Sequence, residues 1–169
     1  MPEILSPKTV LALLFIAVSL EIAALLIYMQ IDTLVNVDLY SYGLEFNKIW
    51  IVEYWFDYRM AVAFLFCAPI AMALNLIPYH LYTVENTKAT RWGCVLFPLI
   101  SAGLLAASIY FTLQVDHVVN STLYNFSLQP NPEWHTKYLF IARTTLTLTG
   151  ASTIIALVMS TVTGIITRD

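Results

Sequence analysis

Long apolar runs alternate with short polar stretches along the chain. Four of these runs are 21 to 23 residues long: Thr9–Met29, Met60–Leu81, Gly93–Val115 and Thr144–Ile166. A helix of roughly 20 residues crosses the hydrocarbon layer of a bilayer, which is about 30 Å thick. Since few polar positions interrupt the runs, they predict four membrane-spanning helices and not the two-faced helices of a soluble bundle.

Composition supports one integral membrane domain over residues 1–169. Hydrophobic residues make up 59% of the chain and charged residues 11%, whereas soluble domains carry about 25% charged residues. The first run contains Ala17-Val18-Ser19, a weak cleavage pattern of a signal peptide, but it continues to Met29. We therefore expect a spanning helix that is retained.

An internal duplication gives the most specific signal. Residues 30–59 align with residues 114–143 without a gap, at an offset of 84 positions, and twelve of the thirty aligned positions are identical. Roughly two or three identities would arise by chance at ordinary residue frequencies. Because each copy joins the end of one apolar run to the start of the next, the chain reads as one helix–loop–helix unit written twice.

The duplication predicts an architecture. Repeat one covers residues 8–82 and repeat two residues 92–166, and both run in the same direction. An all-α protein of four transmembrane helices follows, with an internal twofold axis along the membrane normal. The identities are concentrated in segments 30–58 and 116–138, so we expect two ordered loops that cover one face of the bundle.

The distribution of cations predicts which face that is. Four cations lie in segments on the side of the termini and two in the long loops; they are Lys8, Lys88, Arg91 and Arg168, and Lys48 and Lys137, respectively. Cytoplasmic segments carry the excess of Lys and Arg. We therefore expect both termini in the cytoplasm and both loops outside. Asn120 and Asn125 begin possible glycosylation triplets in the second loop.

Aromatic residues gather where the loops meet the following helices. Those singled out are Trp50, Tyr54, Trp55, Trp134 and Tyr138. Rings with a polar edge collect at the headgroup level of a bilayer. An interfacial belt is therefore expected, with residues 47–58 running helically into the second span. A cradle for a quinone or a lipid tail is the alternative.

Glu21 is the most informative single residue. It lies about twelve residues into the first span, near mid-depth, where an ionised carboxylate costs at least about 2.5 kcal/mol. One interpretation is a carboxyl that handles protons or cations, or that anchors a charged neighbour. The other is a neutral side chain that is hydrogen-bonded within the bundle or to another subunit. The equivalent position in repeat two is Leu105.

Two further intramembrane charges, Arg59 and Arg143, are equivalent in the repeat and lie near the outer ends of their helices. Arginine there can extend its head to the lipid headgroups. Alternatively, one of them reaches Glu21, or both bind an anionic headgroup. The last span is rich in Ser and Thr, which either bond back to their own helix or form a polar stripe toward the bundle. Asn75 lies between Pro69 and Pro78 and is positioned to bond a carbonyl that proline leaves unpaired.

The sequence predicts no catalytic residue, no metal site and no cofactor. His80 lies at the other end of the membrane from His117 and His135, whereas a membrane haem needs two imidazoles at matching depth. Phosphate loops, nucleophile elbows and zinc-binding helix motifs are absent from the sequence. A net charge of −3 without a basic stripe excludes a nucleic-acid partner. The expected partners are the lipid bilayer and either other membrane subunits or further copies of the chain.

Three functions fit these features. The first is a non-catalytic accessory subunit of a larger membrane assembly, favoured by the small size and the lack of cofactor motifs. The second is a small oligomeric transporter or channel that uses Glu21, favoured by the repeat and by the hydroxyl-rich last helix. The third is a quinone- or lipid-binding subunit of a membrane enzyme, which only the aromatic residues of the loops favour.

Overall fold

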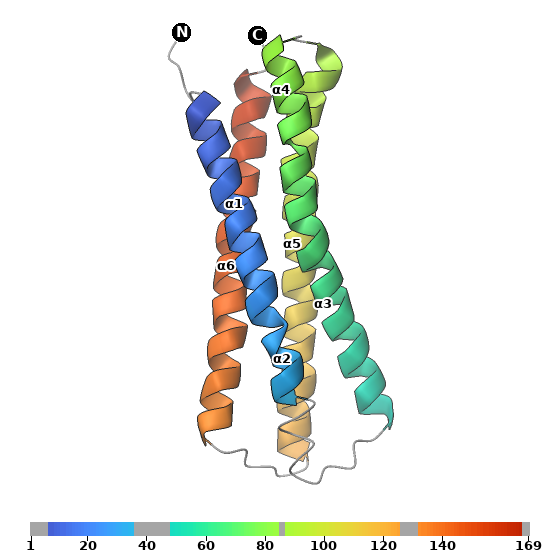
Figure 1. Ribbon diagram of the computed structural model, residues 1–169. Helices are drawn as coiled ribbons and strands as arrows, with labels where there is room; N and C mark the ends of the chain where they lie inside the picture. Colours follow the sequence, from blue (N-terminus) through green and yellow to red (C-terminus); the bar gives the residue numbers. More distant parts are fainter. Residues whose placement is uncertain (1–6, 36–47, 85–86, 126–131, 167–169) are drawn as a thin grey trace.

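The computed structural model describes residues 7–35, 48–84, 87–125 and 132–166, and nearly all of them are helical (Figure 1). Six helices follow one another along the chain: α1 (Pro7–Tyr28), α2 (Gln30–Thr33), α3 (Lys48–Leu74), α4 (Leu76–Val84), α5 (Lys88–Asn125) and α6 (Pro132–Ile166). Helix α2 continues α1 after a single-residue interruption at Met29, and α4 continues α3 after Asn75. The molecule is thus four long helical rods.

All four rods are long and apolar enough to cross a membrane, as the hydrophobic runs predicted. The candidate spans are Lys8–Thr33, Glu53–Val84, Lys88–Ser121 and Pro132–Gly164. Large apolar side chains such as Phe15, Phe66 and Ile154 are exposed on the outside of the bundle. Exposed apolar surface of this kind suits contact with lipid rather than water. A multi-pass membrane protein follows from these features.

The rods form a four-membered ring. Helix α1 packs against α3 and α6, and α5 also packs against α3 and α6, so that α1 and α5 lie diagonally opposite (Figure 1). The start of α1 and the end of α6 lie at one end of the bundle. The ends of α2 and α5 and the starts of α3 and α6 lie together at the other end, called the loop end below.

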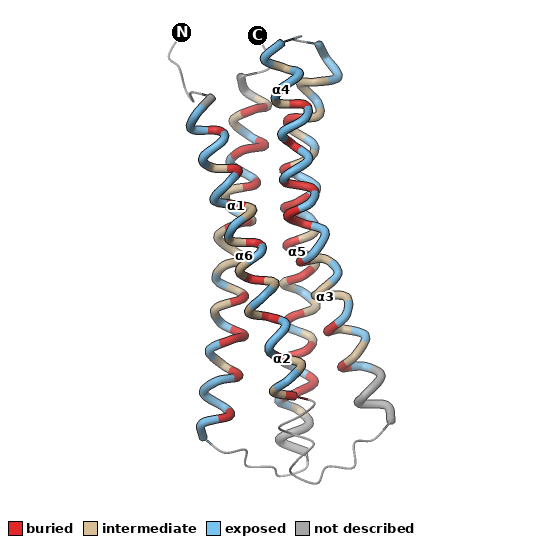
Figure 2. The backbone as a smooth tube through the Cα atoms, in the orientation of Figure 1, coloured by how far each residue is buried: buried red, intermediate tan, exposed pale blue. Residues whose placement is uncertain are grey.

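Buried positions recur at alternating spacings of four and three residues on every rod (Figure 2). This spacing is that of left-handed coiled coils, in which helices cross at about 20°. We call these positions the seam. In α1 and α2 they are Val10, Leu14, Ala17, Glu21, Ala24, Tyr28, Ile31 and Val35; in α3 and at its end, Tyr54, Tyr58, Ala61, Leu65, Ala68, Met72 and Asn75. In α5 they are Cys94, Pro98, Ser101, Leu105, Ser108, Thr112, Val115 and Val119; in α6, Tyr138, Ala142, Thr145, Thr149, Ser152, Ala156, Met159 and Thr163.

The helices are longer than the hydrophobic runs, which corrects the expected loops. Residues 30–33, 116–125 and 132–138 were predicted to be loop but are helical, and α5 has 38 residues, which is about 57 Å. The seam explains the extension of α5, because Val119 continues the buried spacing beyond the apolar run. Asn120 and Asn125 therefore lie on a helix. Residues 36–47 and 126–131, which also belong to the expected loops, lie outside the described residues.

One proline inside a helix, Pro98, is accommodated by a neighbouring helix. Pro98 has no N–H to bond the carbonyl of Cys94 one turn earlier. Thr163 on α6 donates its hydroxyl to that carbonyl at 3.1 Å, and Ser160 donates to the adjacent carbonyl of Val95 at 3.0 Å. The expectation for Asn75 is wrong, since its buried side-chain amide makes no hydrogen bond.

Candidate functional site

Glu21 occupies the middle of the bundle and is completely buried. Its Oε1 atom accepts hydrogen bonds from Ser152 on α6 at 2.7 Å and from Ser101 on α5 at 3.2 Å. The Ser152 hydroxyl also lies 3.3 Å from the backbone carbonyl of Ala17 on α1. One carboxyl group thus connects three of the four rods. We call Glu21, Ser101 and Ser152 the central polar layer.

The positions offset by 84 residues from this layer form its apolar counterpart. Leu105 replaces Glu21, Ala17 takes the place of Ser101, and Ala68 that of Ser152. All three residues are fully buried. The fold therefore accommodates either three polar or three apolar side chains at these equivalent positions. Only the three positions of the central polar layer carry the polar side chains.

Neither arginine singled out from the sequence forms an ion pair with Glu21. The side chains of Arg59 and Arg143 are both exposed. The guanidinium of Arg59 lies 5.1 Å from the centre of the Trp55 ring, a cation–π distance. Among the described residues, then, the partners of Glu21 are neutral hydroxyls.

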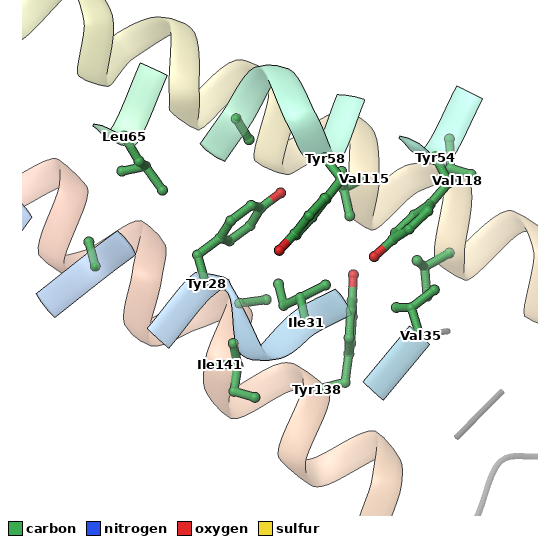
Figure 3. Close-up of a cluster of buried hydrophobic side chains, with 14 of the residues drawn as sticks. Tyr28, Ile31, Val35, Tyr54, Tyr58, Leu65, Val115, Val118, Tyr138 and Ile141 are labelled. Carbon is green, nitrogen blue, oxygen red and sulfur yellow. The ribbon is translucent and has the colours of Figure 1, made fainter. Parts of the chain in front are cut away.

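A second buried group lies toward the loop end and consists of aromatic side chains (Figure 3). Tyr28 stacks on Tyr58 with ring centres 5.5 Å apart, and Tyr58 stacks on Tyr54 at 5.8 Å. Trp134 stacks on Tyr138 at 5.4 Å. The four tyrosines come from α1, α3 and α6, and their hydroxyls point into the space between these helices. We call Tyr28, Tyr54, Tyr58 and Tyr138 the tyrosine cluster.

Hydrogen bonds join this cluster to the helix ends. The Tyr138 hydroxyl donates to a carboxylate oxygen of Asp116 at 3.0 Å, and the Trp134 indole N–H donates to the Leu34 carbonyl at 3.0 Å. The positions equivalent to Asp116 and Tyr138 are Asp32 and Tyr54, so the same pair of residue types recurs in both copies.

Three of the aromatic residues expected at the membrane interface are buried between the helices. Tyr54, Trp134 and Tyr138 are almost completely buried, and Trp55 is half-buried. Seam spacing explains the inward direction of Tyr54 and Tyr138, because both belong to the buried stripe of their helix. The depth of these rings in a bilayer stays a prediction. The side chain of Trp50 lies outside the described residues.

The hydroxyl groups of α6 divide into two kinds. Thr147, Thr149 and Thr153 donate to carbonyls four residues earlier in their own helix. Ser152 and Ser160 donate to other helices, and Thr163 donates both to its own helix and to α5. Both interpretations of this hydroxyl-rich helix therefore apply, to different residues.

No known protein family, curated protein or solved structure matches the chain.

Some polar atoms inside the described part of the bundle lack a hydrogen-bond partner. Among them are Oε2 of Glu21, Oγ1 of Thr145 and both amide atoms of Asn75. Each lies on a seam residue, so it points toward the bundle axis. Within residues 7–35, 48–84, 87–125 and 132–166, no three His, Cys, Asp or Glu side chains are grouped to hold a metal ion.

Proposed function

We propose that this protein is a non-catalytic accessory subunit of a larger membrane assembly, built as a duplicated pair of helical hairpins. The observation that carries the proposal is how its interior polar side chains are used. Glu21, Ser152 and Thr163 each bond to a helix other than their own. Such bonds contribute about 0.6 kcal/mol each on average within a membrane. Several of them, at different depths, favour a single rigid arrangement of the helices.

The duplication is supported by the register of buried positions. All eight seam residues of α1 and α2 coincide, after an offset of 84 positions, with buried residues of α5. All seven seam residues between Tyr54 and Asn75 coincide with buried residues of α6. The diagonal placement of α1 and α5 is what a twofold axis through the centre of the ring requires. We therefore infer two equivalent halves, at residues 8–82 and 92–166.

We further propose an orientation. The ends of α2 and α5 lie at the loop end, whereas Lys8, Lys88 and Arg91 belong to the first turns of α1 and α5, which lie at the opposite end. Because cytoplasmic segments carry the excess of Lys and Arg, we propose that this opposite end faces the cytoplasm. The outer surface of the rods is then free to contact lipid on some sides and partner subunits on others.

Extraction in a mild detergent followed by mass analysis of the intact particle tests this function. A subunit is expected to leave the membrane with other polypeptides in a fixed ratio. Photoreactive residues at the exposed positions Phe15, Phe66, Leu99 and Ile154 should then capture a partner polypeptide from one face and lipid from the others. A lone monomer that captures lipid from every face contradicts the proposal.

A second candidate function, a transporter or channel that uses Glu21, is favoured by the hydroxyls between Glu21 and the loop end. Buried hydroxyl-bearing residues recur along the seam between Glu21 and the loop end: Ser108 and Thr112 on α5, Thr145 and Thr149 on α6, and the tyrosine cluster. Polar side chains are therefore present along the seam from the loop end to Glu21.

Ion flux into liposomes tests this candidate. A transporter is expected to lose flux in Glu21→Gln but to keep it in the exposed control Tyr110→Phe. Equal flux in protein-free liposomes, or full flux in Glu21→Gln, contradicts a role for the carboxyl in transport. Loss of flux together with isolation of an assembly that contains only copies of this chain would favour this candidate over the accessory subunit.

A further inference from the structure

We infer that the protein holds one phospholipid in a groove between α2 and the first turns of α6, with an acyl chain inside the groove and the phosphate at its rim. The groove has a volume of about 450 Å³, within the range of small-molecule sites. It is lined by Ile27, Gln30, Thr33, Leu34, Lys137, Phe140 and Ile141. The inference does not depend on the proposed function.

The lining is arranged as an amphiphile requires. Ile27, Leu34 and Ile141 are partly or fully buried and form an apolar floor. Gln30, Thr33 and Lys137 are exposed and supply amide, hydroxyl and ammonium groups. These groups can donate hydrogen bonds to phosphate oxygens, and the ammonium also contributes charge attraction.

The level of the groove in the membrane matches this chemistry. Ile27 lies near the loop-end limit of the first apolar run, whereas Gln30 and Thr33 lie just beyond it. A hydrocarbon layer of about 30 Å that begins after Lys8 therefore ends close to Met29. Ile27 then lies at acyl-chain depth and Gln30 and Thr33 at headgroup depth, while Leu34 lines the headgroup end of the groove.

The groove is present at only one of the two places that the duplication makes equivalent. The residue equivalent to Ile27 is Phe111. Its ring stacks on Phe64 at 5.7 Å and meets Phe56, the equivalent of Phe140, edge-on at 6.1 Å. An aromatic ring thus fills the corresponding space between α3 and α5. Because the Ile27 side chain is smaller than the Phe111 ring, the equivalent space between α2 and α6 stays open and forms the groove.

The charged residues at the groove and at the equivalent space between α3 and α5 also differ, in a way that favours a phosphate only at the groove. The equivalent of Lys137 is Glu53, and the equivalent of Ile141 is Asp57. The filled place is therefore acidic and repels a phosphate, whereas the open groove has a cation. Lys137 pairs with Glu133 at 3.0 Å, but both side chains are mostly exposed. An exposed pair of this kind is weak, so Lys137 can exchange Glu133 for a phosphate.

The walls are fixed before any lipid binds. The Trp134 indole on α6 donates to the carbonyl of Leu34, at the end of the opposite wall. Trp134 is itself buried and stacked on Tyr138. A preformed groove limits the ordering that binding costs. We therefore expect a retained lipid at this place rather than the rapid exchange of the surrounding bilayer.

Photolabelling of the full chain in phosphatidylcholine nanodiscs tests the inference. The probe is a phosphatidylcholine with a diazirine on the first carbons of one acyl chain, next to the glycerol ester, and mass spectrometry locates the label. We expect more label on Ile27, Phe140 and Ile141 than on the exposed lipid-facing residues Phe15 and Phe66. Equal labelling of the two sets would overturn the inference.

The chain itself supplies the matched variants. Ile27→Phe introduces the ring that the other copy carries and is expected to reduce labelling of the groove to the level at Phe15. Phe111→Ile is expected to open the second place, with new label near Phe56. Lys137→Gln changes only an exposed side chain, and we expect it to weaken lipid retention about fivefold, the contribution of one cation near a phosphate surface. Unchanged labelling in both Ile27→Phe and Lys137→Gln would rule out the groove as a lipid site.

Two other occupants give different results. If a short-chain quinone displaces the label and phosphatidylcholine does not, the groove binds a quinone and not a phospholipid. Capture of a polypeptide instead of lipid at Phe140 would show that a partner helix fills the groove. Either result overturns the lipid inference, and the second leaves the proposed accessory function intact.

Discussion

Replacement of Glu21 by Gln and by Leu distinguishes a hydrogen-bonding role of the side chain from an ionic one. Gln has nearly the same shape and keeps an oxygen that can accept from Ser152 and Ser101. A bond between helices in a membrane contributes about 0.6 kcal/mol on average and at most about 1.7 kcal/mol. We therefore expect Glu21→Gln to change the free energy of unfolding by less than about 1 kcal/mol.

Glu21→Leu removes both bonds and leaves two buried serine hydroxyls. The Ser152 hydroxyl keeps a contact with the Ala17 carbonyl at 3.3 Å, which limits the loss. Two bonds at the magnitudes above give a destabilisation of about 1 to 2 kcal/mol. The triple variant Glu21→Leu, Ser101→Ala, Ser152→Ala copies the apolar counterpart made by Leu105, Ala17 and Ala68. Its stability is expected to return close to that of the unmodified protein.

Unfolding by a denaturing detergent in mixed micelles, followed by far-UV circular dichroism, measures these differences. A carboxylate that is ionised in the bundle costs at least about 2.5 kcal/mol, so its neutralisation would stabilise the protein by a similar amount. A strong stabilisation in Glu21→Gln, or a destabilisation as large as that of Glu21→Leu, would refute the neutral hydrogen-bonded layer.

Two further substitutions test other parts of the interior by the same assay. Thr163→Ala is expected to lower the free energy of unfolding by about 1 kcal/mol. In a Pro98→Ala background the loss should be less than half of that, because the backbone N–H of residue 98 then donates to the carbonyl that the threonine hydroxyl otherwise bonds. Equal costs in both backgrounds would show that Thr163 does not compensate for the proline. Tyr138→Phe removes a bond to a carboxylate and is expected to cost about 1.5 to 3 kcal/mol, whereas the exposed Tyr110→Phe should have no effect; matching results for the two would contradict the assigned bond.

The membrane helices could be predicted because their signal is local. An apolar run of the right length is sufficient to indicate a span, and all four runs form helices. The ends were less predictable, since Val119 continues the seam spacing of α5 after the run has ended at Val115. The spacing of apolar residues along the whole chain, rather than mean hydropathy, would have revealed the extension of α5.

The contacts inside the bundle depend on which helices are neighbours, which no local pattern contains. Glu21 was identified by its chemistry, but its partners Ser101 and Ser152 lie 80 and 131 residues away in the chain. The inward direction of Tyr54 and Tyr138 was missed because aromatic composition alone suggested a lipid interface. Their seam spacing with Tyr58 and Ala142 was the available signal.

Distances between spin labels in lipid nanodiscs test the central claim, which is that the two halves are equivalent. Labels at Phe15 and Phe140 form one pair, and the positions offset by 84 residues, Leu99 and Phe56, form the other; all four side chains are exposed. A twofold axis along the bilayer normal predicts matching distance distributions for the two pairs. Clearly different mean distances would contradict the duplicated architecture.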